Sequence, residues 1–231
     1  MFIKMYKRIY SHILSYFFLA AVLFVPGNVS AGDFLDGIKA DLGSSDWKVR
    51  LAAVGKLDEY RDEKALKMLR SVVDTRSEYW PVKIKAILLL GEARDQKAVD
   101  ILLSIFNDPF YNWECPSIKS YTAIALGNFK GNPKVLDTLI RGAEDRELLT
   151  REASIQSLGK IGDTKAVPCL VGLLVDRSTA IRLSAIKALA GIGDSSAIPH
   201  LQRIAESDSD SVVRSEALAA VSNFHGKGGK N

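Results

Sequence analysis

TREASIQSLGKIGDTKAVPCLVGLLVD (150–176) and IRLSAIKALAGIGDSSAIPHLQRIAES (181–207) are two versions of one sequence pattern. Each has a basic residue at its second position, Gly-Asp near its centre and a proline shortly after the aspartate. Self-similarity at a period of about 20–50 residues is the signature of repeat architectures. This internal repeat therefore decides the fold class.

The repeat extends beyond this pair in both directions. Successive units begin 33, 36, 32, 31 and 32 residues apart, at Val49, Val82, Ile118, Thr150, Ile181 and Val213. We number them units one to six. Unit six contains only the first half of the pattern.

Each unit encodes two helices. The first helix of unit five carries an apolar stripe at helical spacing, formed by Ile181, Ala185, Ile186 and Leu189. Gly193 suits the end of this helix because glycine accepts the left-handed conformation. Asp194 then suits the N-cap of the second helix, and Pro199 is tolerated near that helix start. The pattern predicts a helical hairpin.

Two positions of the first helix recur in every unit. The position of Leu189 is filled elsewhere by Leu57, Leu90, Leu126, Leu158 and Val221. The position of Ala185 is filled elsewhere by Ala53, Ala86, Thr122, Ser154 and Ala217. We expect the first set to form a continuous apolar seam, and the small residues to let neighbouring helices approach closely.

The motif [V/I]-[R/K]-x-x-A, followed by L-G-x-[I/L]-G-D-x-x-A-[V/I]-P-x-L, resembles the HEAT-like repeats of the phycobilisome (PBS) lyase type. The resemblance covers residues 46–224; unit one departs most, with Asp58 where glycine is expected. It implies an all-α fold, an α-solenoid of about five HEAT-like helical hairpins plus terminal capping helices. It also implies a scaffold for binding. Because the family includes bilin lyases, a cofactor-attachment or lyase-like enzyme is the alternative.

The first 31 residues have the features of a secretory signal peptide. An apolar run at 13–25 follows a basic segment and precedes Val29-Ser30-Ala31, which suits cleavage after Ala31. The alternative is an uncleaved anchor, but the run is shorter than the ~20 residues of a spanning helix. We therefore predict export, with the bacterial periplasm as the expected compartment, and no stable membrane insertion after cleavage.

The remaining chain divides by pattern. Residues 32–45 are predicted to form an N-terminal capping helix, 46–225 the solenoid, and 226–231 a disordered tail. The apolar face expected of the cap consists of Phe34, Leu35, Ile38 and Leu42.

Charge argues against a nucleic-acid partner. The chain has 31 Lys and Arg against 27 Asp and Glu, and three of the basic residues, with no acidic one, lie in 1–31. The mature part therefore has 28 against 27, a net charge of +1. A nucleic-acid-binding domain is usually strongly basic, so a protein or peptide partner is expected.

No catalytic set can be found in the sequence. The mature chain has two histidines, His200 and His225, and lacks a phosphate-binding glycine loop. We expect no catalytic residue, no bound metal and no cofactor. Cys115 and Cys169 lie in different units, and we interpret them as independent thiols rather than a disulfide.

Aromatic residues gather before the first helices of units one to three. The tryptophans are Trp47, Trp80 and Trp113, and Tyr79, Phe110 and Tyr111 lie beside them. Two interpretations are open: a hydrophobic staple, which packs on its own helix, or an exposed ridge that contacts a partner.

The second helices give another candidate surface, the expected concave face. Its predicted solvent-side residues are Met68, Ser71, Ile101, Ser104, Thr138, Arg141, Cys169, Gly172, His200 and Arg203. The candidate partner-binding residues are thus Trp47, Tyr79, Trp80, Tyr111, Trp113, Arg141, His200 and Arg203.

One basic residue recurs at the second position of every unit. This basic ladder consists of Arg50, Lys83, Lys119, Arg151, Arg182 and Arg214. It could form a positive stripe for an acidic partner. We favour a structural interpretation, in which each pairs with a loop carboxylate such as the preceding Asp46, Asp145, Asp176 and Asp210.

Overall fold

The computed structural model describes residues 31–112 and 115–227. The predicted signal segment up to residue 30, Trp113 and the last four residues lie outside this range. The chain divides into two compact parts, which are larger than the repeat units: residues 1–37 and residues 38–231. The described residues of the first, 31–37, are the beginning of helix α2 (Ala31–Leu42), which continues into the second.

Helix α2 has the apolar positions expected of the capping helix. Leu35 and Ile38 are buried, whereas Phe34 is exposed. The helix ends at Leu42, before the predicted boundary at residue 45. The role of a cap stays a prediction.

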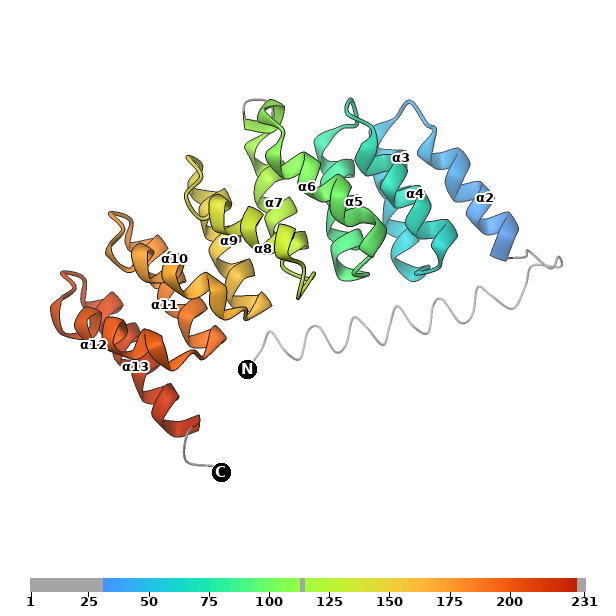
Figure 1. The fold of residues 1–231 in the computed structure, drawn as a ribbon. Helices are drawn as coiled ribbons and strands as arrows, with labels where there is room; N and C mark the ends of the chain where they lie inside the picture. The colour runs from blue at the N-terminus through green and yellow to red at the C-terminus, as the bar shows by residue number, and fades with distance from the viewer. Residues whose placement is uncertain (1–30, 113–114, 228–231) are drawn as a thin grey trace, which may run out of the picture. The chain divides into compact units, whose positions relative to one another are not determined.

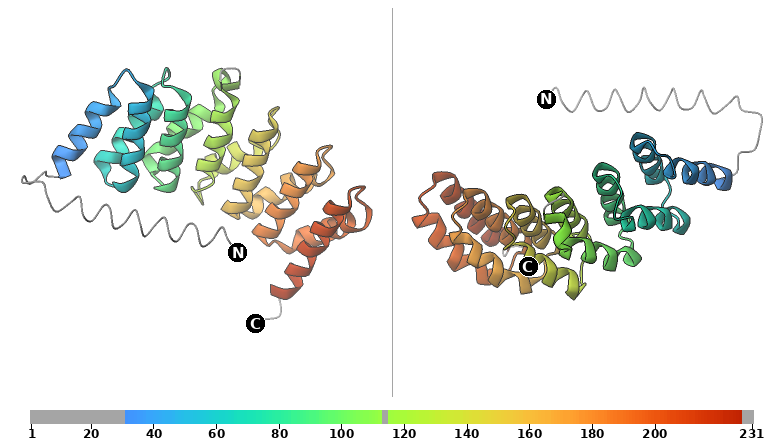
Figure 2. Two further views of the ribbon diagram at one scale, coloured as in Figure 1. Left: turned by 180° about the vertical axis from the view of Figure 1, so that it is seen from behind. Right: turned by 90° about the horizontal axis from the view of Figure 1, so that it is seen from above.

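The described residues from Trp47 to Lys227 form helical hairpins that follow one another in chain order, with a single helix at the end (Figure 1). The first helices of the units are α3 (Trp47–Lys56), α5 (Trp80–Glu92), α7 (Pro116–Leu126), α9 (Leu148–Ile161), α11 (Thr179–Ile192) and α13 (Ser211–Lys227). The second helices are α4 (Glu63–Asp74), α6 (Val99–Asn107), α8 (Pro133–Gly142), α10 (Val167–Gly172) and α12 (Ile198–Ser207). Each first helix contacts the next first helix, so the predicted all-α solenoid is confirmed (Figure 2).

Six short 3₁₀ turns complete the described elements. They are η1 (Leu57–Glu59), η2 (Gln96–Ala98), η3 (Pro109–Asn112), η4 (Thr164–Ala166), η5 (Leu173–Val175) and η6 (Ser195–Ala197). Four of them, η1, η2, η4 and η6, lie between the two helices of a unit. Turn η3 instead lies in the long connection between units two and three.

The predicted apolar seam forms the core. Leu90, Leu126, Leu158 and Leu189 are completely buried. The recurring small residues are buried too, and two of them are polar. A buried hydroxyl needs a hydrogen-bond partner. The hydroxyls of Thr122 and Ser154 donate to backbone carbonyls four residues earlier, at 2.7 and 2.8 Å. These two hydroxyls are therefore satisfied, whereas the buried hydroxyl of Thr150, at the start of unit four, has no hydrogen-bond partner among the described residues.

Neighbouring first helices meet backbone to backbone. A Cβ added to Gly91 would lie 2.7 Å from the Cα of Ala125, and one added to Gly159 would lie 2.8 Å from the Cα of Ala188. Real Cβ atoms essentially never approach that closely. Glycine is thus required at both positions for the observed spacing.

The turn between the helices of a unit has the predicted chemistry. Gly193 adopts φ 77°, and the Asp194 carboxylate accepts from the Ser196 N–H at 2.8 Å. Unit two keeps the aspartate cap, because Asp95 accepts from the Lys97 N–H. However, Arg94 takes the glycine position there with φ 52°, in the region that disfavours side chains.

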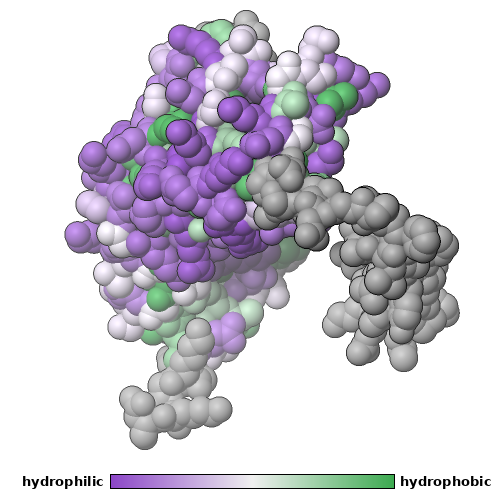
Figure 3. Space-filling view, turned by 90° about the vertical axis from the view of Figure 1, so that its right-hand side faces the viewer, coloured by the Kyte–Doolittle hydropathy of each residue, from purple (hydrophilic) through white to green (hydrophobic). Residues whose placement is uncertain are grey.

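The surface is mainly hydrophilic on the side shown in Figure 3, where hydrophobic residues are scattered in small patches. No helix in the described part of the chain combines the length and apolar character needed to cross a membrane.

Candidate partner-binding site

Three of the predicted aromatic residues form one cluster. Trp47 is the first residue of α3, Trp80 is the first residue of α5, and Tyr79 is the N-cap of α5. Ring centroids are 4.8 Å apart between Trp47 and Tyr79, and 5.7 Å apart between Tyr79 and Trp80. We call these three residues the aromatic patch. It joins units one and two.

The aromatic patch is open to solvent. Trp80 is 48% exposed and Tyr79 is 40% exposed, while Trp47 is half-buried and its ring is tilted against that of Tyr79. A staple residue precedes the N-cap and packs on its own helix. Trp47 and Trp80 instead follow their N-caps, so the exposed patch describes them better than the staple does.

Glu78 holds the aromatic patch in place. Its carboxylate accepts from the backbone N–H of Tyr79 at 2.7 Å and from the Arg50 guanidinium at 2.7 to 3.1 Å. Arg50 also donates to the Ser44 carbonyl at 2.8 Å. These bonds tie the start of α5 to the start of α3, so the rings rest on a fixed support.

The predicted ridge does not continue to Tyr111. This residue is 4% exposed, and its hydroxyl is bonded to Lys83. The reason is η3, which turns Tyr111 inward and leaves its neighbour Phe110 exposed under the Arg76 guanidinium, 4.6 Å from the ring centroid. Trp113 lies outside the described residues.

The candidate residues of the second helices lie apart from the aromatic patch. Arg141 is exposed on α8, and Arg203 and half-buried His200 are on α12. Thr138 was expected to face solvent, and this prediction is wrong. It is 3% exposed because its side chain packs into the core beneath Arg141, which donates to its hydroxyl at 3.1 Å.

The basic ladder is a set of ion pairs in most units. Arg182 makes two bonds to Asp208, at 2.8 and 2.9 Å, and Lys119 bonds Asp145 at 2.5 Å. Arg151 pairs with Asp176. The structural interpretation is thus confirmed, but the partners differ from prediction, because each carboxylate follows the second helix of the same unit instead of preceding the first.

These carboxylates also join consecutive units. Asp208 accepts Arg182 of unit five with its side chain, and its backbone carbonyl accepts Arg214 of unit six at 2.7 Å. Burial alone would raise the pKa of Asp208. The bonds from Arg182 and from the Asp210 N–H outweigh burial and hold that pKa below its usual value.

Two ladder residues have no bonded carboxylate in the described part of the chain: Arg214, which donates to backbone carbonyls in the last unit, and Lys83, which is buried. Lys83 is 1% exposed, and its amine donates to the Val73 carbonyl at 2.9 Å and to the Tyr111 hydroxyl at 3.1 Å. Asp108 occupies the position of Asp208, since it accepts the N–H two residues later in the same way, but it pairs with Arg76 at 3.2 Å. Burial lowers the pKa of the Lys83 amine.

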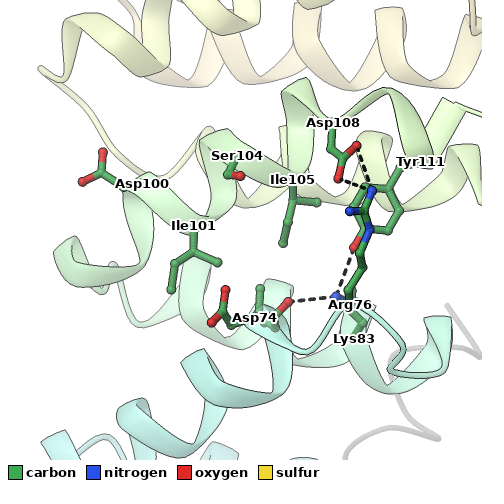
Figure 4. A pocket seen from close by; sticks show the side chains of 10 residues that line it. Asp74, Arg76, Lys83, Asp100, Ile101, Ser104, Ile105, Asp108 and Tyr111 are labelled. Atoms are coloured by element: carbon green, nitrogen blue, oxygen red, sulfur yellow. Dashed lines mark hydrogen bonds and ion pairs between the residues drawn. The ribbon is translucent and has the colours of Figure 1, made fainter.

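A pocket opens beside Lys83. Its volume is about 360 Å³, and it is lined by Val73, Asp74, Arg76, Lys83, Asp100, Ile101, Ser104, Ile105, Asp108 and Tyr111. Figure 4 shows Lys83, Arg76 and Tyr111 on one side of the pocket and Asp100 and Ile101 on the other. Sequence reasoning missed this site.

The described residues contain no group of three His, Cys, Asp or Glu side chains that could hold a metal ion. Cys115 and Cys169 are free thiols. Burial raises the pKa of Cys169, whose sulfur lies 3.9 Å from the Ile140 carbonyl. A thiolate is therefore disfavoured there.

Comparison with solved structures gives likenesses of fold. The CpcE–CpcF complex of phycocyanin lyase from Nostoc sp. PCC7120 is 22% identical, with a TM-score of 0.56 over 86% of this chain and 79% of that chain. A designed armadillo repeat protein in complex with the peptide (KR)4 is 18% identical, with a TM-score of 0.59 over 82% of this chain and 99% of that chain. Comparison with curated proteins gives no significant match.

The model of HEAT repeats matches residues 35–113, 111–178 and 150–222. These ranges include nearly all of the region that the hairpins occupy. The chain is therefore a member of the HEAT-repeat family.

Proposed function

We propose that this protein is an exported, non-catalytic scaffold that binds a protein or peptide partner through the aromatic patch. The observation that carries the proposal is the cluster of Trp47, Tyr79 and Trp80, with two rings about half exposed and all three held in one arrangement. Trp and Tyr are enriched at the hot spots of protein interfaces. Their rigid support reduces the ordering entropy that binding would otherwise lose.

The fold and the charge support the same class of partner. Stacked repeats present extended surfaces that suit macromolecules, and the similar designed armadillo protein binds a peptide. The mature net charge of +1 disfavours nucleic acid. Arg141, His200 and Arg203 on the second helices are proposed as additional contacts at the expected concave face.

The lyase alternative has less support. Lyase-type attachment through this chain would need an activated nucleophile, and Cys169 is half-buried with a raised pKa. The signal-like residues 1–31 support export to the periplasm. We propose that the protein acts there by binding a partner.

The test is recovery of a partner by the full-length protein, expressed with its signal segment and purified from the periplasm. Trp80→Ala should reduce recovery of a specific partner about tenfold or more, because hot-spot truncation commonly weakens binding by that amount. Leu148→Ala is the matched control. Leu148 is also the first residue of a first helix and is 45% exposed, but it lies in unit four.

Circular dichroism should show both variants folded. Recovery that fell equally in the two variants would contradict a role for the aromatic patch. Failure of the folded wild-type protein to retain any specific partner would contradict the scaffold itself.

A further inference from the structure

Comparison with other residues of the basic ladder shows that Lys83 lacks a bonded carboxylate within the described ranges. Arg50, Lys119, Arg151 and Arg182 each have a carboxylate from the loop that ends their own unit. Lys83 keeps the other half of the arrangement, a backbone carbonyl at the end of the preceding helix, here that of Val73. The equivalent carboxylate, Asp108, pairs with Arg76 instead, and the Lys83 amine is bonded to the neutral Tyr111 phenol.

A buried ammonium without a bonded anion is unfavourable. Lysine has three N–H donors, and two of those of Lys83 reach Val73 and Tyr111. Desolvation disfavours the charged form, as the lowered pKa of Lys83 reflects, and an anion placed at hydrogen-bond distance would reverse this. The remaining donor is the natural place for that anion.

The pocket beside Lys83 has room for a small group. A volume of about 360 Å³ lies at the lower end of the range for ligand sites. Val73, Ile101 and Ile105 give it an apolar wall, and the Ser104 hydroxyl lies across from Lys83 (Figure 4). This combination suits a short aliphatic chain that ends in a polar group.

The acidic residues around the pocket limit the charge of the ligand. Asp108 is paired with Arg76, whereas Asp74 and Asp100 are exposed to water at the edge. Arg76 pairs with Asp108, and Lys134 lies 3.9 Å from the Asp100 carboxylate, so among the residues that line the pocket Lys83 is the cation without a bonded carboxylate. A single negative charge at Lys83 can be accommodated, but phosphate or a dicarboxylate would meet repulsion.

We propose that this pocket binds one carboxylate group, carried by a small aliphatic acid or by a protein partner, as the anion that pairs with Lys83. The ligand takes the place that an aspartate or glutamate of the chain itself has in other units. The proposal goes beyond the scaffold function and holds independently of the aromatic patch, which lies at the starts of α3 and α5.

The test uses sodium butyrate as the probe and butyramide as its neutral analogue. Each is titrated into the ¹⁵N-labelled protein at constant ionic strength, and the backbone amide signals are followed by NMR. Butyrate should give saturable shifts at Val73, Ile105 and Tyr111, and butyramide should bind about tenfold more weakly or worse, because a charge-assisted bond is lost.

Lys83→Met should abolish the butyrate shifts while signals of units four to six stay in place. Arg182→Met is the matched control, since it removes a ladder cation that already has its own carboxylate, and it should leave the butyrate shifts intact. Equal binding of butyrate and butyramide, or unchanged butyrate binding in Lys83→Met, would overturn the proposal. Absence of any saturable shift would do the same.

A second arm identifies the source of the carboxylate. Butyrate that displaces the partner recovered with the aromatic patch would assign the group to that partner. Butyrate that binds without displacing it would assign the pocket to a free acid. Both outcomes support a carboxylate site, and neither depends on Trp80.

Discussion

Units two and five begin from the same sequence pattern and differ in how their basic residue is paired. In unit five, Arg182 and Asp208 are joined by two short bonds, and Asp208 also bonds unit six. In unit two, Lys83 has no such carboxylate and borders a pocket with Tyr111. Unit five thus uses the position to join repeats, whereas unit two leaves it available to a ligand.

The same contrast runs through the other variable positions of the two units. Unit five ends its first helix with Gly193 and begins it with Thr179, while unit two has Arg94 and Trp80 at these places. A repeat that departs from the structural optimum at several positions is a candidate for function, since local inconsistencies gather at functional sites. The two sites that we propose, the aromatic patch and the pocket beside Lys83, both include residues of unit two, whereas units four and five preserve the repeat pattern best.

The largest difference should appear when the matched aspartates are removed. Asp208→Ala should lower the free energy of unfolding by about 3 to 5 kcal/mol, because it leaves a buried arginine unpaired. Asp108→Ala should lower it by about 1 kcal/mol or less, because the partner, Arg76, is 66% exposed. Urea denaturation of both variants measures the difference. Similar losses would show that the two units are equivalent.

The two units should also differ, by a smaller amount, in how their basic residues make the free energy of unfolding depend on pH. The folded pKa of Lys83 is depressed below the 10.5 of the unfolded chain, so between these values the unfolded state binds more protons. Lys83 therefore increases the free energy of unfolding as pH rises from its folded pKa toward 10.5. The increase is complete near pH 10.5. Burial raises the pKa of the neighbouring Tyr111 phenol above its usual value.

Denaturation at a series of pH values checks this in the wild type, Lys83→Met and Arg182→Met. The difference in unfolding free energy between the wild type and Lys83→Met should shift in favour of the wild type as pH increases. Arg182→Met should keep the wild-type alkaline trend, because its lysine is intact. A difference that stays flat for Lys83→Met would exclude a perturbed amine.

The smallest effect concerns the turn between the helices. Arg94→Gly should raise the free energy of unfolding by about 0.5 to 1 kcal/mol, since glycine accepts positive φ without steric strain. Gly193→Arg should lower it by a similar amount, because it places a side chain at φ 77°. Thermal unfolding of both variants compares them. Changes of the same sign would contradict the assignment of Arg94 to the glycine position.

The hairpins and their core could be predicted from sequence because they depend on local periodicity. Leu158 and Leu189 recur at one helical position, and Asp194 caps the helix that follows it in the chain. These features need only neighbouring residues. Three of the predicted aromatic residues, Trp47, Tyr79 and Trp80, were also placed together correctly, because each marks the start of a first helix.

The pocket could not be predicted in the same way. The direction in which Arg182 pairs depends on how the second helix returns the chain to the first, which local patterns do not specify. A carboxylate 25 to 28 residues after each paired basic residue is a signal that was available. The inward turn of Tyr111 depends on η3, whose conformation is set by a connection longer than those between other units.

The glycines at 91 and 159 determine how this protein can bend. Ala125 and Ala188 occupy the space that a side chain at residue 91 or 159 would need, so the first helices cannot pack closer at these two contacts. We therefore expect bending of the stack to change the spacing of the second helices more than that of the first helices. A larger residue at 91 or 159 would push two neighbouring first helices apart and change the angle between the repeats on either side.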